Sequence, residues 1–222
     1  MGVDFIEAAS RLMVDHSVSD MNLPTIGTRN RPSKYVGVKA PMFSFTRLGG
    51  ADPILGVEMA STGEVACFGM DVHEAFLKAL ISTGFKIPKK RIALTIPRDL
   101  LEEVVHHVWM LHEMGYELFA TAETYPFLLA KGVPSTLMHF ADSDKIPNIR
   151  TLISNDEIDL VVNLPTSSST DLKNNFLTRR TAVDFGVPLL TNPQLFKMFT
   201  ESLRKHKDGK FHFSKVINYS YI

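Results

Sequence analysis

Residues 91–130, RIALTIPRDLLEEVVHHVWMLHEMGYELFATAETYPFLLA, decide the fold because they repeat one pattern twice. A short apolar run at 92–96 is followed by residues 98–114, in which apolar side chains recur at helical spacing. A second apolar run at 116–120 precedes another helical pattern at 123–130. Two strand–helix units in succession are typical of a parallel sheet covered by helices.

The same alternation continues beyond residue 130. The predicted fold class is therefore α/β, an open parallel sheet with helices on both faces. We expect further strands at 135–140, 158–163 and 187–190, and further helices at 146–154, 171–185 and 192–205.

Residues 1–88 do not follow this rhythm, and we interpret them as an incomplete α+β unit that precedes an α/β domain at 89–222. Asp71 and Glu74 have the spacing of a capping pair at the start of a helix. The expected elements of the first unit are a helix within 1–14, strands at 35–45 and 64–68, and the helix that begins after Asp71.

Composition excludes several classes of function. With 24 basic and 24 acidic residues and no long basic run, we expect no nucleic-acid partner and no membrane association. A single cysteine, Cys67, excludes an internal disulfide and a cysteine-based zinc site. His106, His107 and His112 lack the four-residue spacing of a metal pair, so we predict no metal site. No catalytic motif is present, and we predict no catalytic residue.

Polar residues follow the predicted strands at the points where ligands bind to open α/β sheets. Thr121 and Thr124 follow one strand, Asn163 ends another, and Arg179 lies in the next helix. Hydroxyl, amide and guanidinium groups can hold a carboxylate or a phosphate. The alternative is that the threonines and the asparagine only cap helices. The sequence alone leaves both readings open.

A family resemblance covers nearly the whole chain. Residues 38–69, VKAPMFSFTRLGGADPILGVEMASTGEVACFG, contain the string EMxSTGEV at 58–65. They resemble the end of the second ATP-grasp unit of the carbamoyl-phosphate synthase large chain. Downstream, AFLKALISTGFKIP (75–88), FATAET (119–124), IDLVVNLP (158–165) and RRTAVDFGVPLLTN (179–192) resemble that enzyme's methylglyoxal-synthase-like regulatory domain.

The resemblance implies a role in a longer enzyme that makes carbamoyl phosphate from bicarbonate, ammonia and two ATP. ATP and Mg²⁺ (or Mn²⁺) would bind to upstream synthetase domains, which are the implied partners. We therefore expect no cofactor in this chain and no catalysis by the chain alone. The urea-cycle type is the most similar, which implies the mitochondrial matrix, with the cytoplasm as the alternative.

The resemblance also implies an acidic effector, N-acetyl-L-glutamate in the urea-cycle type. That type has a tryptophan in place of Phe140 and an asparagine in place of Thr166. The effector-binding residues expected by resemblance and by position are Thr121, Thr124, Phe140, Asn163, Thr166, Asn175 and Arg179.

Three alternatives remain. Pyrimidine-pathway members bind UTP or phosphoribosyl pyrophosphate, but PTSSSTDLKNN (165–175) has Lys173 as its only cation, which disfavours a triphosphate. A free-standing lyase of the methylglyoxal-synthase type would need a carboxylate base that neither TAETYP (121–126) nor NLPTSSST (163–170) supplies convincingly. A purely structural piece would use the same polar residues only as caps.

Overall fold

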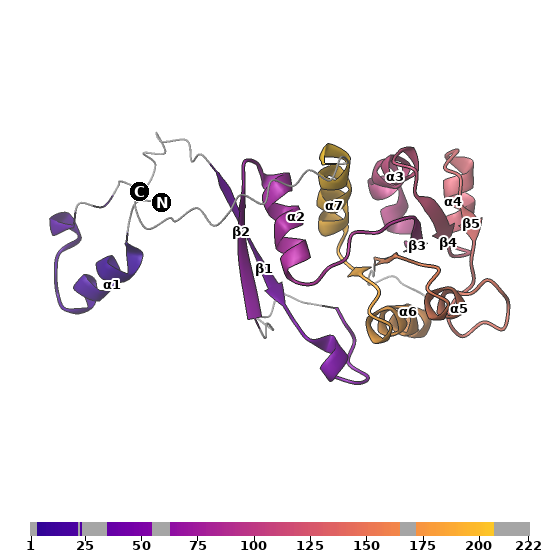
Figure 1. Cartoon of the computed structure of the whole chain (residues 1–222), viewed down its shortest axis with the longest axis horizontal. Helices are drawn as coiled ribbons and strands as arrows, with labels where there is room; N and C mark the ends of the chain where they lie inside the picture. Colours follow the sequence, from indigo (N-terminus) through magenta and orange to yellow (C-terminus); the bar gives the residue numbers. More distant parts are fainter. Residues whose placement is uncertain (1–3, 22, 24–34, 55–62, 165–171, 207–222) are drawn as a thin grey trace.

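The centre of the protein is a parallel sheet of five strands in the order β5-β4-β3-β6-β7. Figure 1 labels three of them, β3, β4 and β5. The computed structural model describes residues 4–21, 23, 35–54, 63–164 and 172–206. The strands of the sheet are β3 (Arg91–Thr95), β4 (Glu117–Ala120), β5 (Thr136–Leu137), β6 (Leu160–Asn163) and β7 (Leu189–Leu190). The predicted parallel α/β sheet is confirmed.

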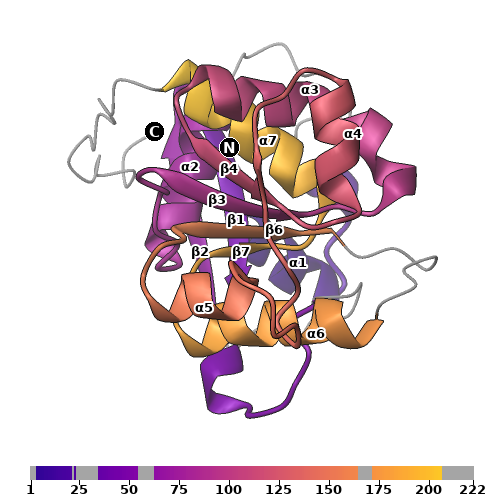
Figure 2. The same ribbon diagram turned by 90° about the vertical axis from the view of Figure 1, so that its right-hand side faces the viewer.

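Helices cover both faces of this sheet, as expected. Figure 2 shows α3, α4 and α7 on one side of the strands and α5 and α6 on the other. Their bounds are α3 (Arg98–Glu113), α4 (Thr124–Ala130), α5 (Ile149–Ser154), α6 (Leu172–Asp184) and α7 (Pro193–Lys205).

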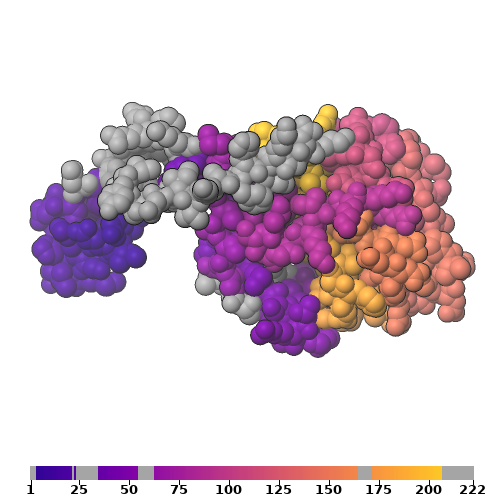
Figure 3. Space-filling model, viewed as in Figure 1, coloured from indigo at the N-terminus to yellow at the C-terminus, as the bar shows by residue number. Residues whose placement is uncertain are grey.

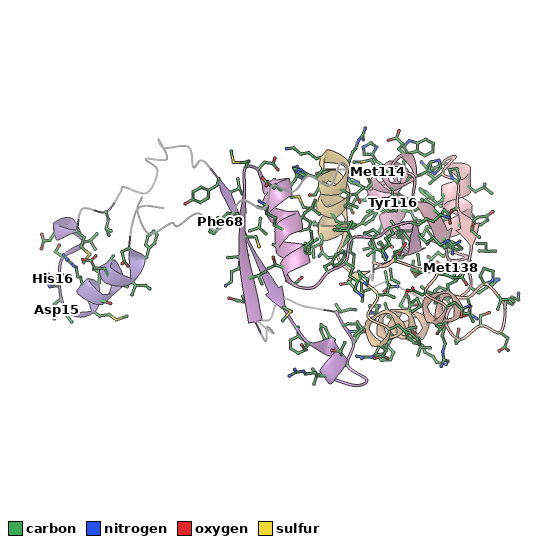
Figure 4. The ribbon with its side chains drawn as sticks, viewed as in Figure 1. Asp15, His16, Phe68, Met114, Tyr116 and Met138 are labelled. Atoms are coloured by element: carbon green, nitrogen blue, oxygen red, sulfur yellow. The ribbon has the colours of Figure 1, made fainter. Side chains whose placement is uncertain are left out.

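Two apolar cores result from this arrangement, one on each face. Leu94 of β3 packs in the core beneath α3 and α7, and the preceding residue, Ala93, packs in the core beside α5 and α6. Met138 belongs to the second core, whereas Tyr116 packs against the first (Figure 4). Because both faces are covered, β3 and β6 read as continuous apolar runs rather than as alternating ones.

The N-terminal elements are smaller. An antiparallel hairpin of β1 (Val36–Met42) and β2 (Gly63–Gly69) lies against α2 (Val72–Ser82), and α2 in turn contacts α7. The helix α1 (Phe5–Met13) lies apart from these elements, as the space-filling view shows (Figure 3). The proposed domain boundary at residue 88 and the ATP-grasp interpretation of the first unit stay predictions.

Asp71 fixes the start of α2 as the sequence predicts. Its carboxylate accepts hydrogen bonds from the backbone N–H groups of His73 (2.9 Å) and Glu74 (3.1 Å). It also pairs with Lys205 of α7 at 3.0 Å. Burial raises the pKa of Asp71, but the hydrogen bonds and the Lys205 charge outweigh it and lower that pKa to about 2. The cap therefore also ties α2 to α7.

The first prediction compares two phenylalanines. Phe196 of α7 is 0% exposed in the larger core, whereas Phe185, just after α6, is 55% exposed. Phe196→Ala should lower the free energy of unfolding by about 3–5 kcal/mol, because it leaves a cavity. Phe185→Ala should change it by less than about 1 kcal/mol. Urea unfolding followed by circular dichroism measures both, and equal losses would contradict the packing described above.

Candidate functional site

Polar side chains lie side by side at the carboxyl ends of three neighbouring strands. Thr95 ends β3 and pairs in register with Asn163 at the end of β6. On the other side of β3, the Thr121 N–H donates to the Leu94 carbonyl at 3.2 Å. Strand side chains alternate between faces, so these three residues share the face that carries α5 and α6. We call Thr121, Thr95 and Asn163 the strand-end row.

Two residues of α6 extend this row. The Asn163 side-chain amide donates to Oδ1 of Asn175 at 2.8 Å, and Oδ1 of Asn163 accepts from Nη1 of Arg179 at 2.8 Å. Asn175 and Arg179 are four residues apart, so they lie on one face of the helix. The structure therefore brings together three of the predicted site residues, Asn163, Asn175 and Arg179.

The Arg179 guanidinium also reaches a residue that the sequence did not single out. Its Nε and Nη2 donate to the two carboxylate oxygens of Asp52, at 2.7 and 2.5 Å. The Arg179 side chain is only 4% exposed, whereas that of Asp52 is 39% exposed. A bidentate arginine–carboxylate pair of this kind is geometrically specific. The pair was not foreseen because its partners lie 127 residues apart.

The two threonines after β4 have different roles. The Thr124 hydroxyl accepts from the Ile96 N–H (3.0 Å) and donates to the Ile96 carbonyl (2.9 Å), so its single proton is already used. The Thr121 hydroxyl lies 3.3 Å from that of Thr124. Thr124 thus joins the start of α4 to β3, which is closer to the capping alternative. Because the Thr124 proton is used, Thr121 is the donor between the two hydroxyls, and it becomes a donor to a ligand only by giving up that bond.

The row also contains a buried hydroxyl that the sequence analysis missed. Thr95 is 6% exposed, and its Oγ1 has no hydrogen-bond partner among the residues that the structure describes. Thr178 of α6 is 0% exposed, and its Oγ1 likewise has no hydrogen-bond partner among the described residues. Buried polar atoms are normally paired with protein or water, so these two hydroxyls have unused hydrogen-bonding capacity. The available signal for Thr95 was a hydroxyl near the end of the apolar run at 92–96.

The structure does not test two of the predicted residues as members of the row. Phe140 is half-buried in the connection between β5 and α5. Thr166 lies outside the described residues, as does most of the EMxSTGEV string at 58–65. Their assignment to the site stays a prediction.

A separate cavity of about 760 Å³ lies at the β7 edge of the sheet. It is lined by residues of β1, of the segment that follows β1, of β7, and of the connection from β7 to α7, which includes Thr191 and Asn192. The Asn192 side chain caps α7 by accepting from the Leu195 N–H at 3.0 Å. Thr191 and Asn192, which follow β7, therefore lie at this cavity and are not members of the strand-end row.

Over the described residues, no group of three or more His, Cys, Asp or Glu side chains could hold a metal ion. In the same part of the chain, no helix has the length and hydropathy needed to cross a membrane. The candidate site therefore rests on hydroxyl, amide and guanidinium groups.

Comparison with known proteins identifies the region that carries this site. The profile of the MGS-like domain family matches residues 103–191, which include β4, β6 and the whole of α6. The chain contains an MGS-like domain. Its sequence is also similar to the C-terminal part of carbamoyl-phosphate synthases, as the resemblance predicts.

Three curated relatives illustrate this similarity. The mitochondrial carbamoyl-phosphate synthase [ammonia] of Homo sapiens is 46% identical over 221 residues, which cover 96% of this chain and 15% of the human protein. Multifunctional protein pyr-3 of Neurospora crassa is 44% identical over 219 residues, or 94% of this chain and 12% of that protein. Multifunctional protein URA2 of Saccharomyces cerevisiae is 40% identical over 217 residues, or 93% of this chain and 10% of that protein. The chain thus spans a small fraction of the length of these relatives.

A matched pair of substitutions tests the hydroxyl assignments. Thr124→Val leaves the buried Ile96 N–H without its partner, so it should lower the free energy of unfolding by about 1–3 kcal/mol. Thr95→Val replaces an unpaired buried hydroxyl with a methyl group, so it should keep stability within about 0.5 kcal/mol or raise it. Urea unfolding of both variants measures the difference. A loss at Thr95 as large as that at Thr124 would show that the Thr95 hydroxyl is already paired.

Proposed function

We propose that this chain is the allosteric effector-binding portion of a carbamoyl-phosphate synthase and that its effector is N-acetyl-L-glutamate. The observation that carries the proposal is the hydrogen-bonded set of Asn163, Asn175 and Arg179 at the carboxyl ends of the sheet. This set lies in an MGS-like domain whose relatives include the ammonia-type mitochondrial synthase.

The chemistry of the row suits a small molecule with carboxylates and an amide. The Thr95 hydroxyl can donate to a carboxylate oxygen, and the Thr121 hydroxyl can do so by exchanging its bond to Thr124. The amides of Asn163 and Asn175 offer both donors and acceptors. Arg179 supplies a guanidinium, the side chain best matched to a carboxylate. Phe140, in the connection after β5, is our candidate for packing against the acetyl group.

The proposal extends to the setting of the chain. We infer that it acts within a longer enzyme in which upstream synthetase domains bind ATP and Mg²⁺ or Mn²⁺ and form carbamoyl phosphate. By the same argument from its relatives, we place that enzyme in the mitochondrial matrix. The effector site would then regulate chemistry that takes place outside this chain.

Two competing functions receive less support from the described residues. UTP carries several negative charges, and the guanidinium bonded to the row, that of Arg179, is already paired with the Asp52 carboxylate. The added negative charge would therefore be poorly compensated. A methylglyoxal-synthase-type lyase needs a carboxylate that is free to accept a proton. The carboxylate joined to the row, Asp52, has both oxygens bound to Arg179.

Isothermal titration with N-acetyl-L-glutamate tests the proposal. The folded chain should bind with saturable heat, and Thr121→Val should raise Kd about tenfold through loss of one hydrogen bond to a charged group. Thr191→Val is the matched control, because Thr191 follows β7 and lies outside the row. It should leave Kd unchanged, and UTP should give no saturable heat.

Three outcomes would contradict the proposal. These are the absence of heat with the folded chain, an equal loss of affinity in both threonine variants, and saturable binding of UTP instead of N-acetyl-L-glutamate. Release of methylglyoxal from dihydroxyacetone phosphate would favour the lyase.

A further inference from the structure

The Arg179 side chain already holds a carboxylate. Its guanidinium donates to both oxygens of Asp52 and, through Nη1, to the Asn163 side chain of the strand-end row. The guanidinium is therefore the point where the row meets a residue from the N-terminal part of the chain. The Asp52 carboxylate accepts two hydrogen bonds from Arg179. A carboxylate of a ligand bound to the row would adopt the same bidentate geometry.

The segment that carries Asp52 is held by the next residue of α6. Nη1 of Arg180 donates to the backbone carbonyls of Phe45, Leu48 and Ala51 at 3.2, 3.0 and 3.3 Å. Asp184, one helical turn further on, pairs with the same guanidinium. Two consecutive arginines of α6 thus bind residues 45–52, one through a side chain and the other through the backbone.

Charge balance decides how an acidic effector can join this arrangement. A buried charge is tolerated when it is paired, and Arg179 is paired with Asp52. A further carboxylate placed on the row would leave one negative charge in excess in a buried site, which is costly. Exchange of Asp52 for one effector carboxylate keeps the charge at Arg179 balanced, and Asp52, at 39% exposed, is already partly in contact with solvent.

We propose that Asp52 is a built-in competitor for the effector carboxylate, and that the effector binds by displacing Asp52 from Arg179. This inference rests on the proposed function and adds the route by which binding is transmitted. Displacement frees one of the two attachments of residues 45–52 to α6 and leaves the contacts of Arg180. Since the effector favours the state without the Asp52–Arg179 pair, it shifts the equilibrium of this segment toward the released position.

The binding experiment compares Asp52→Asn with Asp184→Asn in the full chain, using N-acetyl-L-glutamate as the probe. Asparagine removes the charge at either position and keeps a side-chain acceptor. If Asp52 occupies the guanidinium about 90% of the time, its removal should lower the apparent Kd about tenfold. Asp184→Asn removes the carboxylate from Arg180 rather than from Arg179 and should leave Kd unchanged.

Hydrogen exchange of the unaltered chain provides a second measurement, which does not depend on how well a variant folds. The amides of Arg47, Leu48 and Ala51 are bonded within the segment that carries Asp52. N-acetyl-L-glutamate should increase their exchange while it slows exchange of the Thr121 amide in the row. Slower or unchanged exchange in residues 45–52 would overturn the displacement.

The outcomes separate this inference from the function on which it depends. Binding by the unaltered chain with an equal or higher Kd in Asp52→Asn would overturn the displacement and leave the effector site intact. If neither the unaltered chain nor Asp52→Asn binds N-acetyl-L-glutamate, both the displacement and the proposed function are overturned. Binding by the unaltered chain that becomes tighter in Asp52→Asn, while Kd is unchanged in Asp184→Asn, would support both.

Discussion

The buried guanidinium of Arg179 is the group on which the organisation of the candidate site depends. It is 4% exposed, so it requires partners for its charge and its donors, and it finds them in Asn163 and Asp52. Asn163 lies at the end of a central strand, and Asp52 lies in the segment between the two strands of the N-terminal hairpin. One side chain therefore links the ligand-binding edge of the sheet to the part of the chain that precedes it.

The fold was accessible from the sequence because local patterns and tertiary structure agree. Each strand–helix unit between residues 91 and 205 was predicted within a few residues. Strands that are buried on both faces read as short apolar runs, and the helices that cover them keep an apolar side at helical spacing, so both patterns are visible in the sequence. Strand-end positions also pointed to Asn163 and Thr121 without knowledge of side-chain contacts. This part of the site depends on topology alone.

The rest of the site depends on contacts that no local pattern encodes. Asp52 belongs to a turn-rich connection, and nothing in its neighbourhood connects it to Arg179, 127 residues away. Thr95 reads as one more residue of an apolar strand, and only the three-dimensional structure shows that its hydroxyl is buried without a partner among the described residues. The distinction between Thr121 and Thr124 likewise depends on which hydroxyl reaches Ile96.

A crystal structure of the chain with N-acetyl-L-glutamate tests the central claim most directly. We expect the ligand at the carboxyl ends of β3, β4 and β6, with a carboxylate on Arg179 and with Asp52 no longer within hydrogen-bonding distance of that guanidinium. A ligand in the cavity beside β7, or a ligand on the row with the Asp52–Arg179 pair still in place, would contradict it.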